Sequence, residues 1–513
     1  MFYKKLFLTI LFLATCCASF ATFNVKKSTS KVRVKDGASF IVEKQIDNYR
    51  GGLVKESGGN IEGDSIVFND GVYEDGGKVK LKGKVKLKGD SGSEESTKII
   101  LSGDERFSGE RSGVLYSLEI GGENNLVEGM DQFNSDIVFR DLNSSATFAL
   151  SGRLPRNIIL NGGTVYLEED LHFVDDKFFT GSGKVCLNKR NLHFGSQEMT
   201  SDASLYFDQA EDIELHANFH LASTWTFSGQ SIIEGNRKIL CLEDDANIVL
   251  ERGSTLLLRD LTIKNISGNS IRCLDSAATL TFQNVTWIQD GTYSFTQGKL
   301  CVIDKFSMKG SHVFTYQSCQ PSTICQHGQW IFDRGTTFSY DPTWVECGLT
   351  TEQSMSLLVF EDEKSILELK GATLHVTTTP GMKLKNGTLC IKDKSYIDSE
   401  LDGLFHMEEG VILGNNISGE DMICEVVGGA LLVVRSGALS YKNIQDSSLN
   451  MYNHNAMISI ASGAKLKLHQ TLDIGSGIIE FYDGSRLARA AGTKLLGPVH
   501  FFGSVYNEMC YNN

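Results

Sequence analysis

Residues 255–264, TLLLRDLTIK, and residues 279–288, TLTFQNVTWI, decide the fold, because the second segment repeats the pattern of the first. When Thr279 is laid over Thr255, apolar positions coincide: Leu256, Leu258, Leu261 and Ile263 fall on Leu280, Phe282, Val285 and Trp287. Asp260 likewise falls on Asn284. Alternation with period 2 predicts two short strands in each segment, joined at a polar corner. Such a unit cannot bury its apolar side alone, so it must stack on another like it.

Composition favours a stacked, strand-rich chain over several compact domains. The 513 residues include 51 Gly but only 5 Pro, and few stretches have a helical period. A solenoid can use so long a chain in one domain because its core grows in one dimension. The net charge of −14 argues against nucleic acid as a partner, since surfaces that bind nucleic acid are basic.

Residues 1–21 are predicted to be a secretory signal of bacterial type rather than part of the fold. Lys4 and Lys5 precede an apolar run too short to span a bilayer, and Ser19 and Ala21 supply small residues for cleavage. A lipoprotein signal is the alternative, with Cys16 lipidated, although the Thr before it departs from that pattern. No later stretch reaches 18 apolar residues, so we expect no transmembrane segment in a secreted, periplasmic or surface-bound chain.

Strand patterns divide the remaining sequence into three parts without a clear linker. Residues 22–95 predict an N-terminal strand-rich cap or early turns, and residues 96–500 a continuous coil. Residues 310–350 are rich in turn residues and predict a loop inserted between turns of the coil. Residues 501–513 are expected to form a C-terminal tail.

A short repeat, GKVKLKGKVKLK at 77–88, is a candidate binding stripe. If the register continues across Gly83, alternation places all of its lysines on one side: Lys78, Lys80, Lys82, Lys84, Lys86 and Lys88. The favoured interpretation is a solvated strand edge whose lysines oppose aggregation. The functional alternative is a basic stripe for anionic glycans or lipid headgroups.

Ten cysteines remain after the signal (12 − 2), and they suggest two roles. In strand patterns such as 239–243 (ILCLE) and 299–303 (KLCVI), the Cys is expected to face away from the flanking apolar pair. In the predicted loop, a disulfide between Cys319 and Cys325, or between either of them and Cys347, fits an oxidising compartment. A zinc site with His327 is the rival, although its spacing matches no standard pattern.

At Leu256–Asn265, LLLRDLTIKN, the chain resembles the right-handed parallel β-helix proteins, which include pectate-lyase-like enzymes and autotransporter-passenger-like adhesins. The resemblance implies an all-β parallel β-helix, a β-solenoid with three short strands per turn. In that architecture a tight polar turn joins two of the strands, where Asp260 and Asn284 stand here. The likeness is one of architecture and implies no particular activity.

The polysaccharide-cleaving members of that superfamily use carboxylate clusters beside basic residues or calcium, and this pattern is not reproduced here. Acidic clusters at 168–170, 175–176 and 243–245 each follow an apolar strand, where Asp is also favoured for turns. His216 and His220 resemble a metal pair, but the alternating run 213–220 predicts a strand, which would hold them about 13 Å apart. We therefore predict no catalytic residue, metal site or cofactor.

Two functions of different classes remain as hypotheses. The first is a secreted or surface-attached, non-catalytic binding or structural rod, adhesin-like, whose partners are glycans or proteins of a host or cell envelope. The second is a polysaccharide lyase or hydrolase on the same scaffold. The first is favoured because long repetition is present whereas a carboxylate-plus-base constellation is not.

Overall fold

The computed structural model describes backbone and side chains from residue 118 to 378 and from 458 to 509, apart from short gaps. Those gaps are 129–135, 151, 210–211, 363, 459, 461, 464 and 475–477. Between 32 and 117 and between 379 and 457 it describes mainly the backbones of strands. The chain forms two compact units, residues 1–183 (unit 1) and 184–513 (unit 2).

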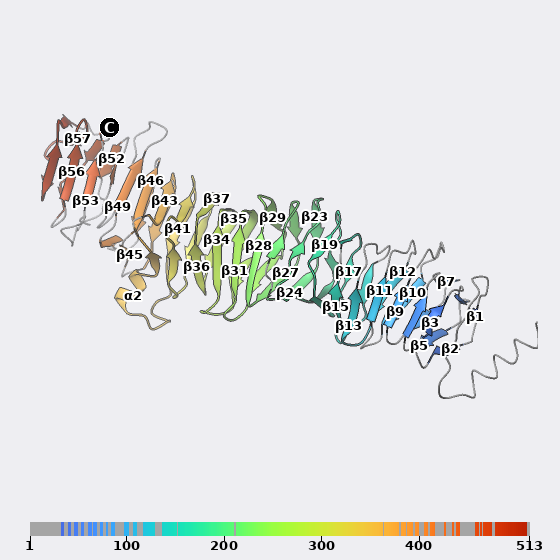
Figure 1. The fold of residues 1–513 in the computed structure, drawn as a ribbon. Helices are drawn as coiled ribbons and strands as arrows, with labels where there is room; N and C mark the ends of the chain where they lie inside the picture. Colours follow the sequence, from blue (N-terminus) through green and yellow to red (C-terminus); the bar gives the residue numbers. More distant parts are fainter. Residues whose placement is uncertain are drawn as a thin grey trace, which may run out of the picture. The chain divides into compact units, whose positions relative to one another are not determined.

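The architecture is a parallel β-solenoid of about 14 turns, with about 2% helix, so the predicted all-β, parallel fold is confirmed. Each strand pairs in parallel with a strand about one turn later in the sequence, as β31 (Thr255–Arg259) does with β34 (Thr279–Gln283). In Figure 1 the strands of unit 2 stand side by side as a series of arrows.

In unit 1 the described strands fall mainly into two parallel sheets. The first includes β10 (Thr97–Leu101), β12 (Tyr116–Ile120), β14 (Ile137–Phe139), β17 (Ile158–Ile159) and β20 (Phe179–Thr180). The second includes β11 (Arg106–Gly109), β13 (Asn125–Glu128), β15 (Ser145–Ala149) and β18 (Thr164–Leu167). Alternate residues are buried in the strands whose side chains are described, as along Ser145–Ala149, so apolar side chains fill the interior there.

Unit 2 carries three parallel sheets, named here by number. Sheet one contains β22 (Leu192–His193), β25 (Asp212–Glu214), β28 (Gln230–Glu234), β31, β34, β36 (Lys299–Val302), β39 (Ser322–Ile324) and β42 (Leu358–Phe360). Sheet two begins with β23 (Met199–Ser201), β26 (Phe219–Leu221), β29 (Ile239–Leu242), β32 (Thr262–Gly268) and β35 (Val285–Phe295). Sheet three includes β24 (Ser204–Asp208), β27 (Thr224–Ser228), β30 (Asn247–Leu250) and β33 (Ile271–Cys273). From β22 to β35, every third strand returns to the same sheet.

Sheet two then runs on towards the C-terminus. It takes in β37 (Lys305–Lys309), β38 (Val313–Tyr316), β40 (Gln329–Phe332), β41 (Thr337–Tyr340), β43 (Ile366–Lys370), β44 (Thr373–Val376), β46 (Thr388–Lys392), β53 (Met457–Ile460), β56 (Ile478–Tyr482) and β59 (Val499–Phe502). A further sheet includes β54 (Lys465–Leu468), β57 (Arg486–Arg489) and β60 (Tyr506–Met509). Strands therefore occupy part of 501–513, where the sequence predicted a tail, because Val499–Phe502 pairs in register with 479–482.

The register between the two segments that decide the fold is the one predicted. Thr255 pairs with Thr279 and Leu258 with Phe282, as the repeated pattern requires. In the following strands Ile263 pairs with Trp287. The eight apolar residues that match between the two segments are at most 3% exposed, so the repeated apolar pattern is the core of the coil. Turn stacks on turn because the same inward positions recur.

Aromatic side chains continue this core through the neighbouring turns. The ring of Phe282 stacks on that of Phe306, with centroids 3.8 Å apart and planes 2° from parallel. Trp287 is fully buried and meets Phe282, Phe306 and Tyr293 edge to face at 5.1–5.8 Å. Edge-to-face contacts are a favoured geometry of aromatic pairs, so the contacts of Trp287 add to what burial alone contributes.

The polar corner between strands has left-handed backbone. Asp260 has φ 48° and Asn284 φ 55°, a region that Asp and Asn tolerate better than other residues with a Cβ. In the turn before, Gly235 lies against this corner, where the backbone N–H of Gly235 donates to the carbonyl of Arg259 at 2.8 Å. The expectation of a tight turn at Asp260 and Asn284 is met by these angles.

Candidate functional site

The lysine repeat does not form one continuous strand. Lys78 and Lys80 lie in β8 (Lys78–Lys80), whereas Lys84 and Lys86 lie in β9 (Lys84–Leu87). The two strands belong to different sheets, and each has a paired strand on both sides, so neither is the solvated edge that the sequence favoured. Because β8 and β9 belong to different sheets, they are not one strand with a single alternation. Lys82 and Lys88 lie outside the described residues.

The region 310–350 contains four strands and a disulfide. Residues 313–340 continue the turns as β38 to β41, and the connection lies between Tyr340 and Leu358. There the short helix α2 (Thr351–Met355) begins with a capping box between Thr350 and Gln353. A disulfide joins Cys319 to Cys347, one of the pairings that the sequence left open.

Cys325 is not part of this disulfide; it is a free cysteine that lies beside another free cysteine in the preceding turn. Its Sγ lies 3.5 Å from that of Cys301, which β36 contributes, and both residues are half-buried. Burial, and after it the neighbouring thiol of Cys301, raise the pKa of the Cys325 thiol to about 12. A thiol with so high a pKa is a poor nucleophile at neutral pH, so this pair does not suggest thiolate catalysis.

Loss of the disulfide is expected to destabilise the region around it. The closed loop spans 28 residues, for which the chain-entropy model gives about 3–4 kcal/mol. We expect the double variant Cys319→Ser/Cys347→Ser to unfold at a lower urea concentration, measured by circular dichroism, and reductant to shift the wild type similarly. The variant Cys301→Ser should keep the sensitivity to reductant. An unshifted midpoint for the reduced wild type would contradict a stabilising disulfide.

The acidic clusters contain residues at turns between strands, where Asp is favoured. Asp175 and Asp245 have φ values of 54° and 69°, which place both at left-handed corners. Asp176 forms an ion pair with Lys177 at 2.8 Å, and that hydrogen bond lowers the pKa of the carboxyl group. The clusters at 168–176 and 243–245 fall in different units. Their placement at corners is explained by turn chemistry.

His216 and His220 lie in separate clusters, and the prediction of one alternating strand over 213–220 is wrong. The strand β25 ends at Glu214, bends occur before Phe219, and β26 begins there in another sheet. Alternation could not reveal this corner because Leu215 is buried on the inside of the corner and keeps the apolar pattern. Because the strand ends between them, the imidazoles of His216 and His220 contact different residues.

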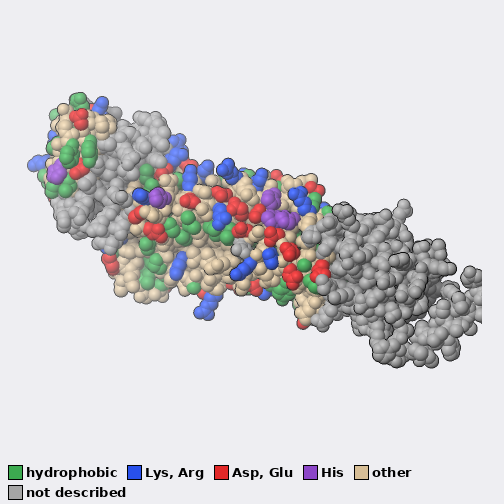
Figure 2. Space-filling model, in the orientation of Figure 1, with side chains coloured by type: hydrophobic (Ala, Val, Ile, Leu, Met, Phe, Trp, Pro, Cys, Tyr) green, Lys and Arg blue, Asp and Glu red, His purple; other side chains and the backbone are tan. Residues whose placement is uncertain are grey.

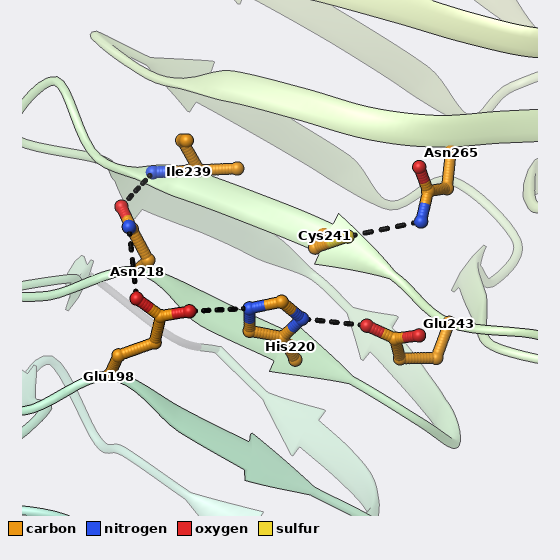
Figure 3. Close-up of polar contacts among 7 residues, drawn as sticks. All are labelled: Glu198, Asn218, His220, Ile239, Cys241, Glu243 and Asn265. Atoms are coloured by element: carbon orange, nitrogen blue, oxygen red, sulfur yellow. Dashed lines mark hydrogen bonds and ion pairs between the residues drawn. The ribbon is translucent and has the colours of Figure 1, made fainter.

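His220 lies between two carboxylates from neighbouring turns (Figure 3). Its Nδ1 is 2.6 Å from an oxygen of Glu243, and its Nε2 is 3.0 Å from an oxygen of Glu198. The hydrogen bonds to Glu243 and Glu198 raise the pKa of His220, while the hydrogen bond from His220 lowers that of Glu198. Since both nitrogens face carboxylates, the protonated imidazolium, which donates from both, is the form that this cluster stabilises.

The neighbouring Cys241 is held by a separate contact in the same view. Asn265 donates from its side-chain amide to Cys241 Sγ at 3.1 Å. Cys241 is 8% exposed, and its strand neighbours Leu240 and Leu242 point inward. Cys241 was expected to face away from these two leucines. The register confirms this, because it places Cys241 beside His220 on the outer side of sheet two.

A second cluster contains His193, Glu214 and His216. His193 Nδ1 lies 3.1 Å from Glu214 Oε2 and 3.4 Å from His216 Nε2, and His216 Nε2 lies 3.6 Å from the same carboxylate oxygen. The side chain of His216 is 42% exposed and that of His193 13%. Figure 2 shows histidines gathered beside acidic side chains on the surface of unit 2. This cluster was not predicted, because the spacing of His216 and His220 in the sequence suggested those two as the pair.

Sheet one presents a regular outer face over β28, β31, β34 and β36. Its side chains form three columns that run from turn to turn. The first is Gln230, Thr255, Thr279 and Lys299, and the second is Ile232, Leu257, Thr281 and Cys301. The third is Glu234, Arg259 and Gln283, joined to Asp304 by side-chain hydrogen bonds of 2.8–3.3 Å. A central, mostly apolar column therefore lies between two polar ones.

No family model matches the chain, and neither a curated protein nor a solved structure matches it. Within the described residues, no helix has the length and apolar character needed to cross a membrane.

Proposed function

We propose that this chain is a secreted or surface-attached β-solenoid that binds an extended glycan of a host or cell envelope without cleaving it. The observation that carries the proposal is the outer face of sheet one, with its apolar column between two polar columns. A sugar chain has apolar ring faces and hydroxyl edges, and this face offers an apolar group for the rings at Ile232 and Leu257 and polar groups for the hydroxyls on either side. Successive strands lie about 4.8 Å apart, so an extended ligand along the columns meets the same groups repeatedly.

Two features support the two parts of this proposal. The disulfide between Cys319 and Cys347 supports a secreted location, because disulfides persist in oxidising compartments. The hydrogen bonds of Arg259 to Glu234 and Gln283 hold the third column in fixed positions, and a preorganised surface loses less entropy when a ligand binds.

A glycan array probed with the purified chain 22–513 tests the proposal. The variant Ile232→Asp/Leu257→Asp places charge in the apolar column, so we expect at least about tenfold weaker binding. The matched control Thr224→Asp/Thr226→Asp places the same charges on the outer side of β27 in sheet three, and it should bind as the wild type does.

Two outcomes would contradict the proposal. Equal binding by the sheet-one variant and its control would exclude this face as the site, and a folded wild type that binds no glycan would exclude the function. New reducing or unsaturated ends in a bound polysaccharide would instead support the alternative, a polysaccharide lyase or hydrolase.

A further inference from the structure

Three side-chain atoms of unit 2 converge on one point at the surface. They are Nδ1 of His193, Nε2 of His216 and Oε2 of Glu214, and they form a triangle with sides of 3.1, 3.4 and 3.6 Å. The ring centroids of the two histidines are 5.6 Å apart, and the rings are nearly parallel. The carboxylate oxygen completes the set.

The fold fixes this triangle through the core beneath it. His193 and Glu214 are paired neighbours in β22 and β25, and the preceding residues Leu192 and Ile213 are fully buried. His216 follows Leu215, also fully buried, at the corner where β25 ends. Each of the three functional residues is therefore anchored by a neighbour in the core, as a preorganised site requires.

The distances match those between ligands of a tetrahedral zinc ion. Zinc bonds nitrogen and carboxylate oxygen at about 2.0–2.2 Å, so two ligands of one tetrahedral ion lie roughly 3.3–3.5 Å apart. The three sides of 3.1, 3.4 and 3.6 Å bracket this range, and two histidines with one glutamate is a known zinc donor set. His216 is 42% exposed, so a fourth position on the solvent side is open to water.

The His220 cluster provides an internal contrast. His220 Nδ1 lies 2.6 Å from the oxygen of Glu243, which is too short for two ligands of one tetrahedral ion but suits a charge-assisted hydrogen bond. Both nitrogens of that ring already face carboxylates. The two clusters are thus chemically different, and of the two the His193 cluster has the donor spacing that suits a tetrahedral ion.

We propose that His193, Glu214 and His216 bind a zinc-like divalent transition-metal ion and leave one coordination position for water or an anionic ligand group. Glu214 is the register neighbour of Glu234, so the ion would lie beside the third column of sheet one. The proposal is independent of glycan binding, since zinc binding is measured without any glycan.

The test is calorimetric titration of the chelator-treated chain 22–513 with Zn²⁺ alone. We expect one equivalent to bind, and the variant His193→Gln/His216→Gln to bind at least about 100-fold more weakly. Glu214→Gln should weaken binding less than the double variant. The matched control His220→Gln, which changes a histidine in the other cluster, should bind as the wild type does.

Cobalt substitution and a folding control make the outcome decisive. Co²⁺ at this site should give the visible absorption of a tetrahedral nitrogen and oxygen set, without a thiolate band. A thiolate band would place the ion on the cysteines and overturn the proposal. Unchanged affinity in His193→Gln/His216→Gln, or lost affinity in His220→Gln, would also overturn it. Circular dichroism of each metal-free variant shows that a lost affinity is not lost folding.

Discussion

Replacement of Trp287 by alanine is expected to lower the free energy of unfolding by about 3–5 kcal/mol. Trp287 is fully buried, and its ring meets Phe282, Phe306 and Tyr293 edge to face. Alanine would leave a cavity among these rings, which the stacked turns cannot close without moving the paired strands. Urea unfolding followed by far-ultraviolet circular dichroism measures the change, since removal of a tryptophan alters fluorescence directly.

Trp287→Phe is the matched control for this prediction. None of the described residues accepts a hydrogen bond from Nε1 of Trp287, so phenylalanine removes volume but no polar contact. We expect it to cost roughly half as much as alanine or less. If both variants were equally destabilised, the indole would have a role that its apolar contacts do not explain.

Replacement of Gly235 by alanine is expected to destabilise the coil by about 3 kcal/mol or more. A Cβ at this position would clash with Cβ of Leu261 and would lie 2.8 Å from the carbonyl oxygen of Asp260. Both atoms belong to the polar corner of the next turn, whose backbone is held by strand pairing. The clash can be relieved only by separating two turns, so the urea midpoint should fall clearly.

Gly253→Ala separates this steric effect from backbone strain. Gly253 has φ 68°, but a Cβ there would meet nothing within 4 Å. Its alanine variant should therefore cost only the left-handed conformation, about 1–2 kcal/mol. Equal destabilisation of the two variants would show that close packing between turns at Gly235 is not the reason for glycine there.

The fold was predictable because the inward apolar positions of residues 255–264 and 279–288 match without a gap. Leu256, Leu258 and Ile263 have counterparts at Leu280, Phe282 and Trp287, so an ungapped comparison finds the register. The polar corner was predictable for a second reason, since Asp and Asn are the residues that accept the left-handed backbone seen there. Both signals are local, and neither needs knowledge of distant contacts.

The candidate metal site was not predictable by the same comparison. The offset from His193 to its partner Glu214 is shorter than that from Thr255 to Thr279, because turns differ in length. Moreover, the alternation of apolar and polar residues continues through the corner after Glu214, so the sequence gives no sign of that corner. The structure shows that β25 and β26 belong to different sheets and that His216 contacts His193. A sequence comparison that allowed turns of different length would align His193 with Glu214, and this alignment could have shown that the two residues are neighbours.

The parallel register has a consequence for how such a chain can change over evolution. Residues 255–278 are one complete turn, and the inward side chains of residues 255–263 lie next to their counterparts in the turn that follows. Duplication or excision of a whole turn restores the same kind of neighbours, whereas loss of one residue inside a strand exchanges its inner and outer faces. Selection can therefore lengthen or shorten the coil in whole-turn steps, while single-residue insertions are confined to its corners.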